Sequence, residues 1–550
     1  MARKLLVIMS SRANEESLMS RTILAAALLL TSMAAQAATP RDTLVMAWNL
    51  DALITLDPAQ IGEVNGGDII LGNVCTPLVN YDPKDSAHII PAAAESWSTS
   101  PDGLTLTFKL RADLKFPDGR PATAADAAWS MQRAVLLGYG NSANFTQWGF
   151  TKAGIAEQIR ATDDRTVVVT MDKPYPTNLI LSAAFASDVA VILDREAGTR
   201  NAKIVDGVSD YGNAAFKTAP VCVGPYHVSR WDANDVVVLE RNENYFGPKP
   251  GMRRVIVRHV PESSAERLLL EKGDIDVARL LTADDLKALE ANKDIHIEQT
   301  LMQGMSYLAI NTLDPVLGNP KVREAFRYLI DYDGLAKSIL PFQGAPRASL
   351  VPTGAVGALD RAAGEPFSLD LARAKQLITE AGYPDGFTKH LILSANSISP
   401  NIAQHVASNA AKIGIKLELE QMADSNLFTR GRNREFEVQL VGWSTNYADA
   451  DAMVSRFAVN PDARPEAKLT QYPVWRTGWQ NLDINAQAAA ARMEPDPAKR
   501  TAMYHAIQEF MMHNGPMVFI YQTIRPIAVR ASVKGFTIAP FFVDYGSASK

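Results

Sequence analysis

The sequence predicts an α/β protein made of at least two domains. The chain has 550 residues, and a single hydrophobic core usually stops growing at about 250–300 residues. Segments in which apolar and polar residues alternate, as in β-strands, are interleaved with segments whose apolar residues recur every three or four positions, as in helices. This mixed order favours lobes in which helices pack on sheets.

The first 37 residues predict an export signal. An apolar core at residues 22–33 follows Arg21, and Ala35-Gln-Ala37 fits the small-x-small pattern that signal peptidase cleaves. We therefore expect a mature chain that begins at Ala38 and is soluble in the periplasm. A membrane anchor is the alternative, but the apolar core is shorter than the ~20 residues that a spanning helix needs.

The start of translation is left open by the residues before this core. Glu15 and Glu16 are out of place in a basic leader, and the segment from Met19 would make a compact leader alone. Translation from Met1 and translation from Met19 are both compatible with the sequence.

The composition is that of an ordinary soluble globular protein. Hydrophobic residues make up 47% and charged residues 21% of the chain, and the formal net charge is −5. A mildly acidic chain without basic blocks is a poor ligand for nucleic acid or for an anionic membrane surface.

Five segments predict strands, by alternation or by their content of β-branched residues. They lie at residues 104–110, 166–170, 235–239, 254–258 and 415–420. In the first of them Leu106, Phe108 and Leu110 alternate with polar residues, so one face of this strand is expected to be buried.

Four segments predict helices. Thr123 followed by Asp126 resembles a capping box, which satisfies the first backbone N–H groups of a helix, and this helix is expected to reach about residue 136. Apolar residues at helical spacing predict further helices at 321–330, 371–381 and 401–413, and Gly382 is placed as a C-terminal cap.

Seven segments, taken in order along the chain, resemble one family. The first contains Ala-Glu-Ser-Trp followed by Asp-Gly-Leu-Thr-Leu-Thr-Phe, and the last reads Gly-Trp-Ser-Thr-Asn-Tyr. The seven lie at residues 94–111, 115–126, 223–226, 271–276, 319–326, 380–387 and 442–447. They are similar to motifs of the family 5 periplasmic solute-binding proteins of dipeptide, oligopeptide and nickel ABC importers. Most of them are expected to shape turns and bends rather than to contact a ligand.

The resemblance implies a two-lobed periplasmic binding protein fold, with the ligand cleft between the lobes and an extra domain inserted in the N-terminal lobe. It divides the chain into a signal peptide (1–37), a first part of lobe one (38–80), the inserted domain (81–195), a second part of lobe one (196–300), lobe two (301–514) and a C-terminal return to lobe one (515–550). The crossings between the lobes would be residues 303–311 and 516–522, and the lobes would close around the ligand by a hinge motion.

The same resemblance implies the extracytoplasmic solute-binding component of an ABC importer. Such a protein would capture a peptide-like or other small polar organic solute and deliver it to permease subunits in the inner membrane. We expect it to act as a monomer without a cofactor. An exported chaperone or a chemoreceptor-linked binding protein of the same fold is one alternative.

A secreted hydrolase is the other alternative. The sequence contains neither G-x-S-x-G nor H-E-x-x-H, and its eight histidines are scattered. These motifs carry a nucleophile and a metal site respectively, so we expect neither catalysis nor a bound metal.

Eight residues are candidates for ligand contact. A polar solute inside a closed cleft needs hydrogen-bond partners and apolar surface. The resemblance and the residue types together indicate Asn65, Tyr307, Asn396, Trp443, Ser444, Asn446, Tyr447 and Asp449. For Tyr307 a place in the core is an equal alternative, and for Asp449 the alternative is a solvated surface loop.

Two of these candidates predict a cleft without charged anchors. By resemblance, peptide-binding relatives carry an Asp at the position of Asn446 for the ligand ammonium and an Arg near residues 394–400 for the ligand carboxylate, where Asn396 stands here. Because a buried charge needs a partner, we expect simple dipeptides to bind poorly and an opine-like, sugar-like or modified-peptide solute to bind better. Longer peptides, which backbone pairing can anchor, are the alternative. Asp449 or Asp451 would restore the acidic partner if their loop were shifted.

The two cysteines, Cys75 and Cys222, leave two states open. An even number of cysteines in an oxidising compartment allows a disulfide. Two buried, inert thiols are equally compatible with the sequence, and only the distance between the residues decides.

Overall fold

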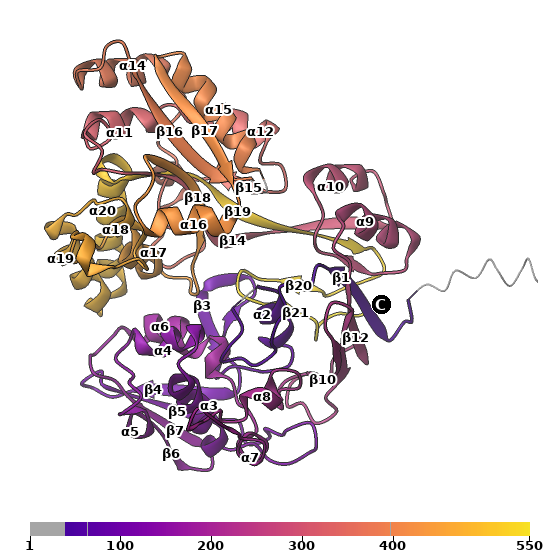
Figure 1. The fold of residues 1–550 in the computed structure, drawn as a ribbon. Helices are drawn as coiled ribbons and strands as arrows, with labels where there is room; N and C mark the ends of the chain where they lie inside the picture. The colour runs from indigo at the N-terminus through magenta and orange to yellow at the C-terminus, as the bar shows by residue number, and fades with distance from the viewer. Residues whose placement is uncertain (1–38, 63, 396–397) are drawn as a thin grey trace, which may run out of the picture.

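A computed structural model describes residues 39–550, except residue 63 and residues 396–397; the side chains of residues 64 and 65 are also not described. The expected export signal and Asn396 lie outside the described residues. The protein has two lobes, which are joined by two long strands (Figure 1).

One continuous sheet runs through both lobes. We call the part built on its first five strands lobe one. In sheet order these are β10 (Tyr226–Asp232), β11 (Val236–Arg241), β12 (Arg254–His259), β1 (Thr43–Trp48) and β13 (Val277–Ala278). β1 lies parallel to both β12 and β13 and is buried along its whole length, because side chains pack on both faces of the sheet.

The joining strands are β14 (Ile295–Ile310) and β19 (Met517–Arg530), which pair with each other antiparallel. Their register shifts between Leu301 and Met305, where the pair passes from one lobe to the other. β19 pairs with strands of lobe two through residue 523 and with β13 of lobe one at residues 528–529. The return to lobe one therefore lies later in the chain than residue 515.

We call the part of the sheet beyond β14 lobe two. Its strands are β18 (Val438–Ser444), β16 (Phe387–Ser394), β17 (Ile415–Met422) and the short β15 (Gly344–Pro346) beside β19. Leu308 and Ile310 face one apolar core and Tyr307 and Ala309 face another. Helices therefore cover both faces of this sheet. They are α11 (Pro320–Arg327), α12 (Tyr332–Ser338), α14 (Leu371–Glu380), α15 (Ser399–Ala411), α16 (Asp424–Arg432), α17 (Ala450–Phe457), α19 (Leu482–Met493) and α20 (Pro497–Asn514).

A separate four-stranded sheet lies within the stretch expected to be inserted in lobe one. Its order is β4 (Ala94–Thr99), β5 (Thr105–Leu110), β7 (Thr166–Thr170) and β6 (Ile159–Asp163), and α3 (Ala124–Leu137) packs on it. We call this sheet, α3 and the short helices up to Ala190 the inserted domain. Those short helices include η1 (Gly140–Ser142), α4 (Ala143–Thr146) and η3 (Asp188–Ala190).

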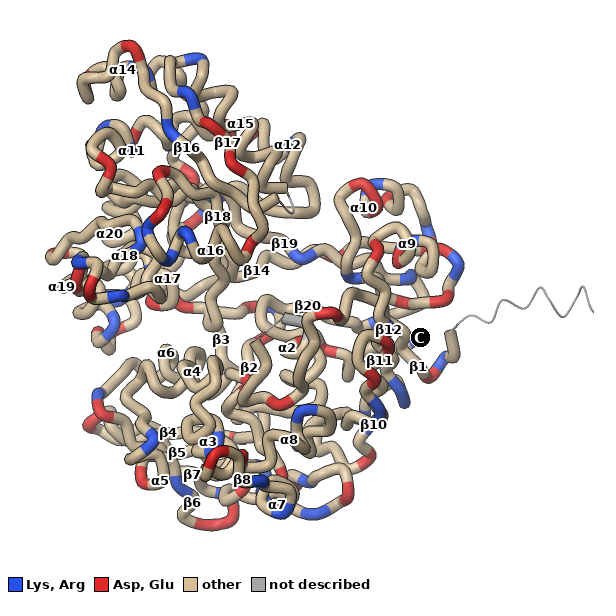
Figure 2. Tube along the Cα trace, viewed as in Figure 1, with Lys and Arg blue, Asp and Glu red and all other residues tan. Residues whose placement is uncertain are grey.

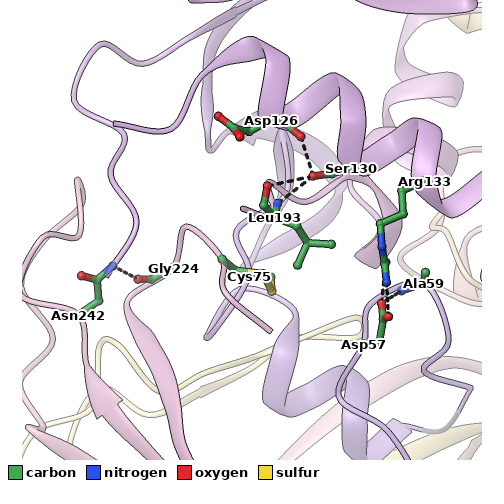
Figure 3. The surroundings of a disulfide bond; sticks show 10 residues. Asp57, Ala59, Cys75, Asp126, Ser130, Arg133, Leu193, Gly224 and Asn242 are labelled. Atoms are coloured by element: carbon green, nitrogen blue, oxygen red, sulfur yellow. Dashed lines mark hydrogen bonds and ion pairs between the residues drawn. A yellow bond between two sulfur atoms is a disulfide. The ribbon is translucent and has the colours of Figure 1, made fainter. Parts of the chain in front are cut away.

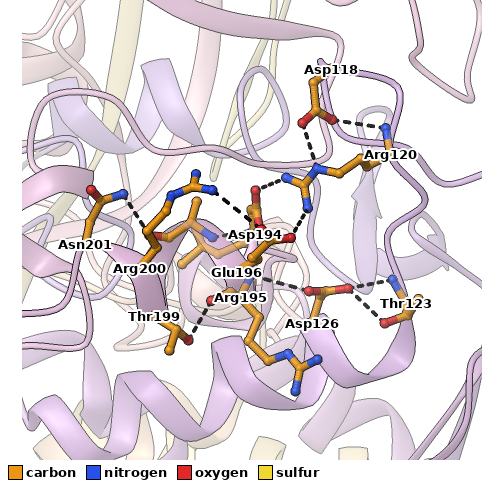
Figure 4. A network of polar contacts seen from close by, with 12 residues as sticks. Asp118, Arg120, Thr123, Asp126, Asp194, Arg195, Glu196, Thr199, Arg200 and Asn201 are labelled. Atoms are coloured by element: carbon orange, nitrogen blue, oxygen red, sulfur yellow. Dashed lines mark hydrogen bonds and ion pairs between the residues drawn. The ribbon is translucent and has the colours of Figure 1, made fainter.

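Polar contacts fix the start of α3 and of the neighbouring α7 (Arg195–Arg200) (Figure 4). Thr123 and Asp126 form the predicted capping box. Arg120 bonds Asp118 and also reaches Asp194, which caps α7. The carboxylate of Asp126 also accepts a hydrogen bond from the backbone N–H of Arg195 at 3.3 Å, which links the starts of the two helices directly (Figure 4).

Cys75 and Cys222 form a disulfide, with their Cα atoms 4.9 Å apart (Figure 3). Cys75 follows α2 (Val64–Ile70), and Cys222 precedes β10. A Cβ on Gly224 would lie 2.2 Å from the carbonyl oxygen of Val74, so the two bonded segments approach too closely for any other residue there.

The strands and helices predicted from periodicity are confirmed within one to three residues at most ends. β5 has the predicted alternation, with Leu106, Phe108 and Leu110 buried. α11 is shorter than predicted: it ends at Arg327 rather than Ile330, because Tyr328 leaves helical geometry.

Lys, Arg, Asp and Glu are interspersed over both lobes (Figure 2). Among the described residues, no helix is both long and apolar enough to cross a membrane.

Candidate functional site

A cavity of about 350 Å³ lies where the two lobes, the joining strands and the inserted domain meet. Its polar lining residues are Asp68, Tyr81, Asn141, Asn144, Ser187, Asp188, Gln303, Ser444, Thr445, Asn446, Thr523 and Arg525. Cavities of this size hold small organic ligands, and this one is lined by both lobes.

The lobe-one wall carries two arginines that share one aspartate. Asp68, on α2, accepts hydrogen bonds from Arg525 Nη1 at 3.0 and 3.1 Å, and its second partner is the Nη2 of Arg279. Asp68 and Arg279 are almost fully buried, with 4% and 6% of their side chains exposed, and Arg525 is 16% exposed. One carboxylate cannot neutralise two guanidinium groups, so this wall is net positive.

The fold explains why Arg279 reaches this wall. It follows β13, at the carboxyl end of the parallel pair β1 and β13, where ligand sites of open α/β sheets usually lie. Its guanidinium stacks on Trp48 at the end of β1, with its carbon 4.2 Å from the ring centre. Its Nη1 is buried and has no hydrogen-bond partner among the described residues.

The inserted-domain wall carries an acid. Asp188 begins η3 and accepts hydrogen bonds from the amides of Asn141, at 2.8 Å, and Asn144, at 3.4 Å. Burial raises the pKa of Asp188 to about 7, since loss of water destabilises its charged form. Within the described residues, no Lys, Arg or His pairs with it.

The lobe-two wall is polar and uncharged. Ser444, Thr445 and Asn446 follow the buried part of β18, and Asn446 donates to the Oδ1 of Asn144 at 3.5 Å. Gln303, on β14, has a buried Oε1 without a hydrogen-bond partner in the described part of the chain. The hydrogen bond between Asn446 and Asn144 brings the lobe-two wall into contact with the inserted-domain wall beside the cavity.

One aromatic pair closes another side of the cavity. Tyr81 and Phe541 stack with ring centres 4.6 Å apart, and both line it. Tyr81 is anchored by its hydroxyl, which donates to the backbone oxygen of Ser182 at 2.8 Å.

Of the residues predicted to contact the ligand, Ser444 and Asn446 line this cavity. Trp443 points to the other face of β18, where it packs against Phe457 and lies 5.8 Å from the Arg476 guanidinium. Asn65 lies on α2, but its side chain is not described; Gly67 and Asp68 of the same helix do line the cavity.

Three other candidates lie in the interior. Tyr307 is 1% exposed and packs against Phe457 and Phe519. Tyr447 is 5% exposed and donates to Asp451 at 3.0 Å.

Asp449 is the third of these, and its carboxylate is bonded twice by Arg500, at 2.7 and 2.8 Å. Asp451 is held in the same way by Arg492, at 2.8 and 2.9 Å. Neither acid lines the cavity that contains Asn446, but Asp451 lines a second cavity, between the inserted domain and lobe two.

The cavity has charged residues that the sequence analysis did not indicate. Asn446, which is neutral, lines it, and Asp188, Asp68 and Arg525 line it too. No sequence motif marked these three residues, because they come from segments far apart in the chain. A charged residue within the otherwise apolar stretch 524–529 is a signal that could have indicated Arg525.

Two further cavities lie nearby. One, of about 320 Å³, shares Arg525 and is lined by Trp48 and Arg279. The other, of about 570 Å³, lies between the inserted domain and lobe two and includes Lys173, Arg456 and Arg492, but no residue of a joining strand. Among the described residues, no group of three or more His, Cys, Asp or Glu side chains is arranged to hold a metal ion.

Comparison with known protein families identifies the family of this chain. Residues 88–464 match the model of the bacterial extracellular solute-binding proteins, family 5. The chain belongs to this family. It is the extracytoplasmic solute-binding component of an ABC importer.

Relatives in this family match nearly the whole chain. The probable D,D-dipeptide-binding periplasmic protein DdpA of Escherichia coli K12 is 27% identical over 94% of this chain and 96% of its own length. The glutathione-binding protein GsiB of the same strain is 26% identical over 81% of this chain and 83% of its own length. The structure of HbpA2 from Haemophilus parasuis has the same two-lobed fold, with a TM-score of 0.76 and 23% identity over 92% of this chain and 99% of its own.

Proposed function

We propose that the cavity between the lobes is the solute site and that the solute is a small, polar, peptide-like molecule. The observation that carries this proposal is the cavity itself, which both lobes and both joining strands line. A solute there would be enclosed by groups from two bodies that can move apart, which is how a hinged binding protein holds its ligand.

The lining supports a peptide-like solute. Amides and hydroxyls of Gln303, Ser444, Thr445 and Asn446 can exchange hydrogen bonds with amide groups of a ligand. Two relatives are named for binding a D,D-dipeptide and glutathione, both of which contain amides.

Delivery of the solute to the permease would depend on closure of the two lobes around it. The inserted domain touches lobe two through the hydrogen bond between Asn144 and Asn446. A second contact joins the segment before β4 to lobe two: the hydroxyl of Ser86 donates to the backbone oxygen of Gly354 at 2.9 Å. A permease in the inner membrane that recognises the closed arrangement would accept only loaded protein. We propose that the protein acts in this way as a periplasmic monomer, after cleavage of its signal peptide, and without catalysis.

The test is to identify what the protein carries. Protein purified from the periplasm is denatured, and the released solute is analysed by mass spectrometry. We expect one small polar organic compound at close to one per chain, and its return to ligand-free protein should raise the melting temperature.

A variant that fills the cavity gives the control. Gly67 lines the cavity, and a Cβ added there meets no atom within 4 Å. Gly67→Phe should fold and lose the solute, and Gly67→Ala should keep it. Full occupancy of Gly67→Phe would show that the solute lies elsewhere.

A further inference from the structure

The cavity between the lobes has two charged walls of opposite sign. Asp188 lies on the inserted-domain wall, and Arg525 lies on the lobe-one wall. Both residues line the same cavity of about 350 Å³, so a single small solute can contact both.

The acidic wall lacks a cation of its own. The partners of Asp188 are the amides of Asn141 and Asn144, and among the described residues no charged group of a neighbouring element is in ion-pair contact with it. Asp68, the other acid that lines the cavity, is already bonded to two arginines. Of the two acids that line the cavity, Asp188 is therefore the one available to an ammonium group, and a carboxylate partly withdrawn from water gains from such a partner.

The basic wall has one positive charge in excess. Arg279 and Arg525 both bond Asp68. The nearby Glu266 does not balance the second arginine, because burial raises the pKa of Glu266 to about 8 and keeps it largely protonated at neutral pH. Arg525 borders the cavity and can take a ligand carboxylate while Asp68 stays bonded to Arg279.

We propose that this cavity selects a zwitterionic solute, with its ammonium group against Asp188 and its carboxylate against Arg525. Both charged groups of the ligand are then held by lobe one and its inserted domain, and lobe two contributes only uncharged hydrogen bonds. This assignment rests on the proposed function of the cavity and adds the charge of the solute to it.

Binding of a zwitterion in this orientation should change the protonation of Asp188. In the empty protein the carboxyl of Asp188 is partly protonated near neutral pH. An ammonium group beside it favours the charged form, so binding should release a proton below about pH 7 and affinity should rise as the pH approaches that value.

The first experiment is a thermal-shift screen with stated probes. The panel contains zwitterions (L-Ala-L-Ala, D-Ala-D-Ala, glutathione and single amino acids), the N-acetylated and C-amidated forms of the same peptides, and neutral sugars. We expect stabilisation by one or more zwitterions and not by the blocked forms. A panel in which no zwitterion binds, or in which a blocked form binds as well as its parent, overturns the assignment.

The second experiment measures affinities by calorimetry to test which wall of the cavity binds which end of the ligand. Asp188→Asn should weaken the best zwitterion by about 30-fold or more, and should leave its N-acetylated form unchanged. Arg525→Gln should do the same for the carboxylate, with the C-amide unchanged. If Arg525→Gln is unstable, Arg525→Lys takes its place in the test. This variant keeps the positive charge and should retain most of the affinity.

The control is Arg120→Gln, which removes an arginine that lies outside this cavity. Proton release measured in buffers of different ionisation enthalpy should vanish in Asp188→Asn.

If the solute released from the native protein lacks an ammonium or a carboxylate, the assignment of charge fails while the proposed function stands. If no solute is released and none binds, the proposed function fails.

Discussion

Arg133 and Arg253 show how burial decides what a charged residue contributes to stability. Arg133, on α3, has no exposed side-chain surface and bonds Asp57 through both of its terminal nitrogens, one of them at 2.9 Å (Figure 3). Arg253 is 61% exposed and bonds Asp42, which is 51% exposed. An exposed ion pair contributes up to about 1 kcal/mol, because water already solvates both charges.

Loss of the Arg133 guanidinium should therefore be costly. Arg133→Met leaves the carboxylate of Asp57 buried without a cation, and the expected loss in the free energy of unfolding is about 3–5 kcal/mol. Arg253→Met, the matched control, breaks an exposed pair and should cost about 1 kcal/mol or less. Urea denaturation measures both, and equal losses in the two variants would contradict this account.

Glu266 should make the stability depend on pH. Its side chain is fully buried, and burial raises its pKa to about 8, above the ordinary value of 4.5 that it has in the unfolded chain. Between these values the native protein holds a proton that the unfolded chain has released. The free energy of unfolding therefore falls as pH rises through this window, by about 1.4 kcal/mol per pH unit from this group.

Glu266→Gln removes this titration and keeps the shape of the side chain. The difference in unfolding free energy between the native protein and the variant should change steadily from pH 5 to pH 8 and then level off. Chemical denaturation at several pH values measures it. Parallel curves for the two proteins would mean that Glu266 is charged in the folded state.

At the scale of the element, local patterns predicted most strands and helices, because each depends on residues close in sequence. The alternation in β5 and the capping box of α3 are of this kind. The cavity depends on contacts between distant segments. The pair Asp68 and Arg525 is separated by 457 residues, and no local period records it. For the same reason, the residue type of Asp188 gave no sign that it would line the same cavity as Asn446.

The disulfide ties two such distant segments together. It closes a loop between residues 147 positions apart, and the chain-entropy model gives about 5 kcal/mol of stabilisation against the unfolded chain. Cys75→Ala combined with Cys222→Ala should lower the free energy of unfolding by up to this amount.

The native protein under reducing conditions is the control for the double variant. It should lose a similar amount of stability, and the variant should not respond to the reductant. Detection of two free thiols in denatured, unreduced protein would contradict the bond.

For the whole molecule, the first expectation concerns export. Ala35-Gln-Ala37 predicts cleavage before Ala38. N-terminal sequencing of periplasmic protein should read Ala-Thr-Pro-Arg-Asp. Ala35→Leu places a large side chain in the cleavage pattern and should leave a longer precursor; an unchanged N-terminus in this variant would move the cleavage site elsewhere.

The placement of both charged walls on the lobe-one side predicts the order of binding. Solute meets Asp188 and Arg525 first, and closure then brings Ser444, Thr445 and Asn446 onto it. Asn446→Ala removes one hydrogen bond made after closure, which is worth about 0.5–1.5 kcal/mol, so the dissociation rate should rise about 2- to 12-fold while the association rate stays the same. Arg525→Gln acts on the encounter and should lower the association rate as well, most strongly at low ionic strength. Stopped-flow fluorescence with the solute recovered from the native protein measures both rates. A slower association in Asn446→Ala with an unchanged dissociation rate would mean that lobe two meets the solute first.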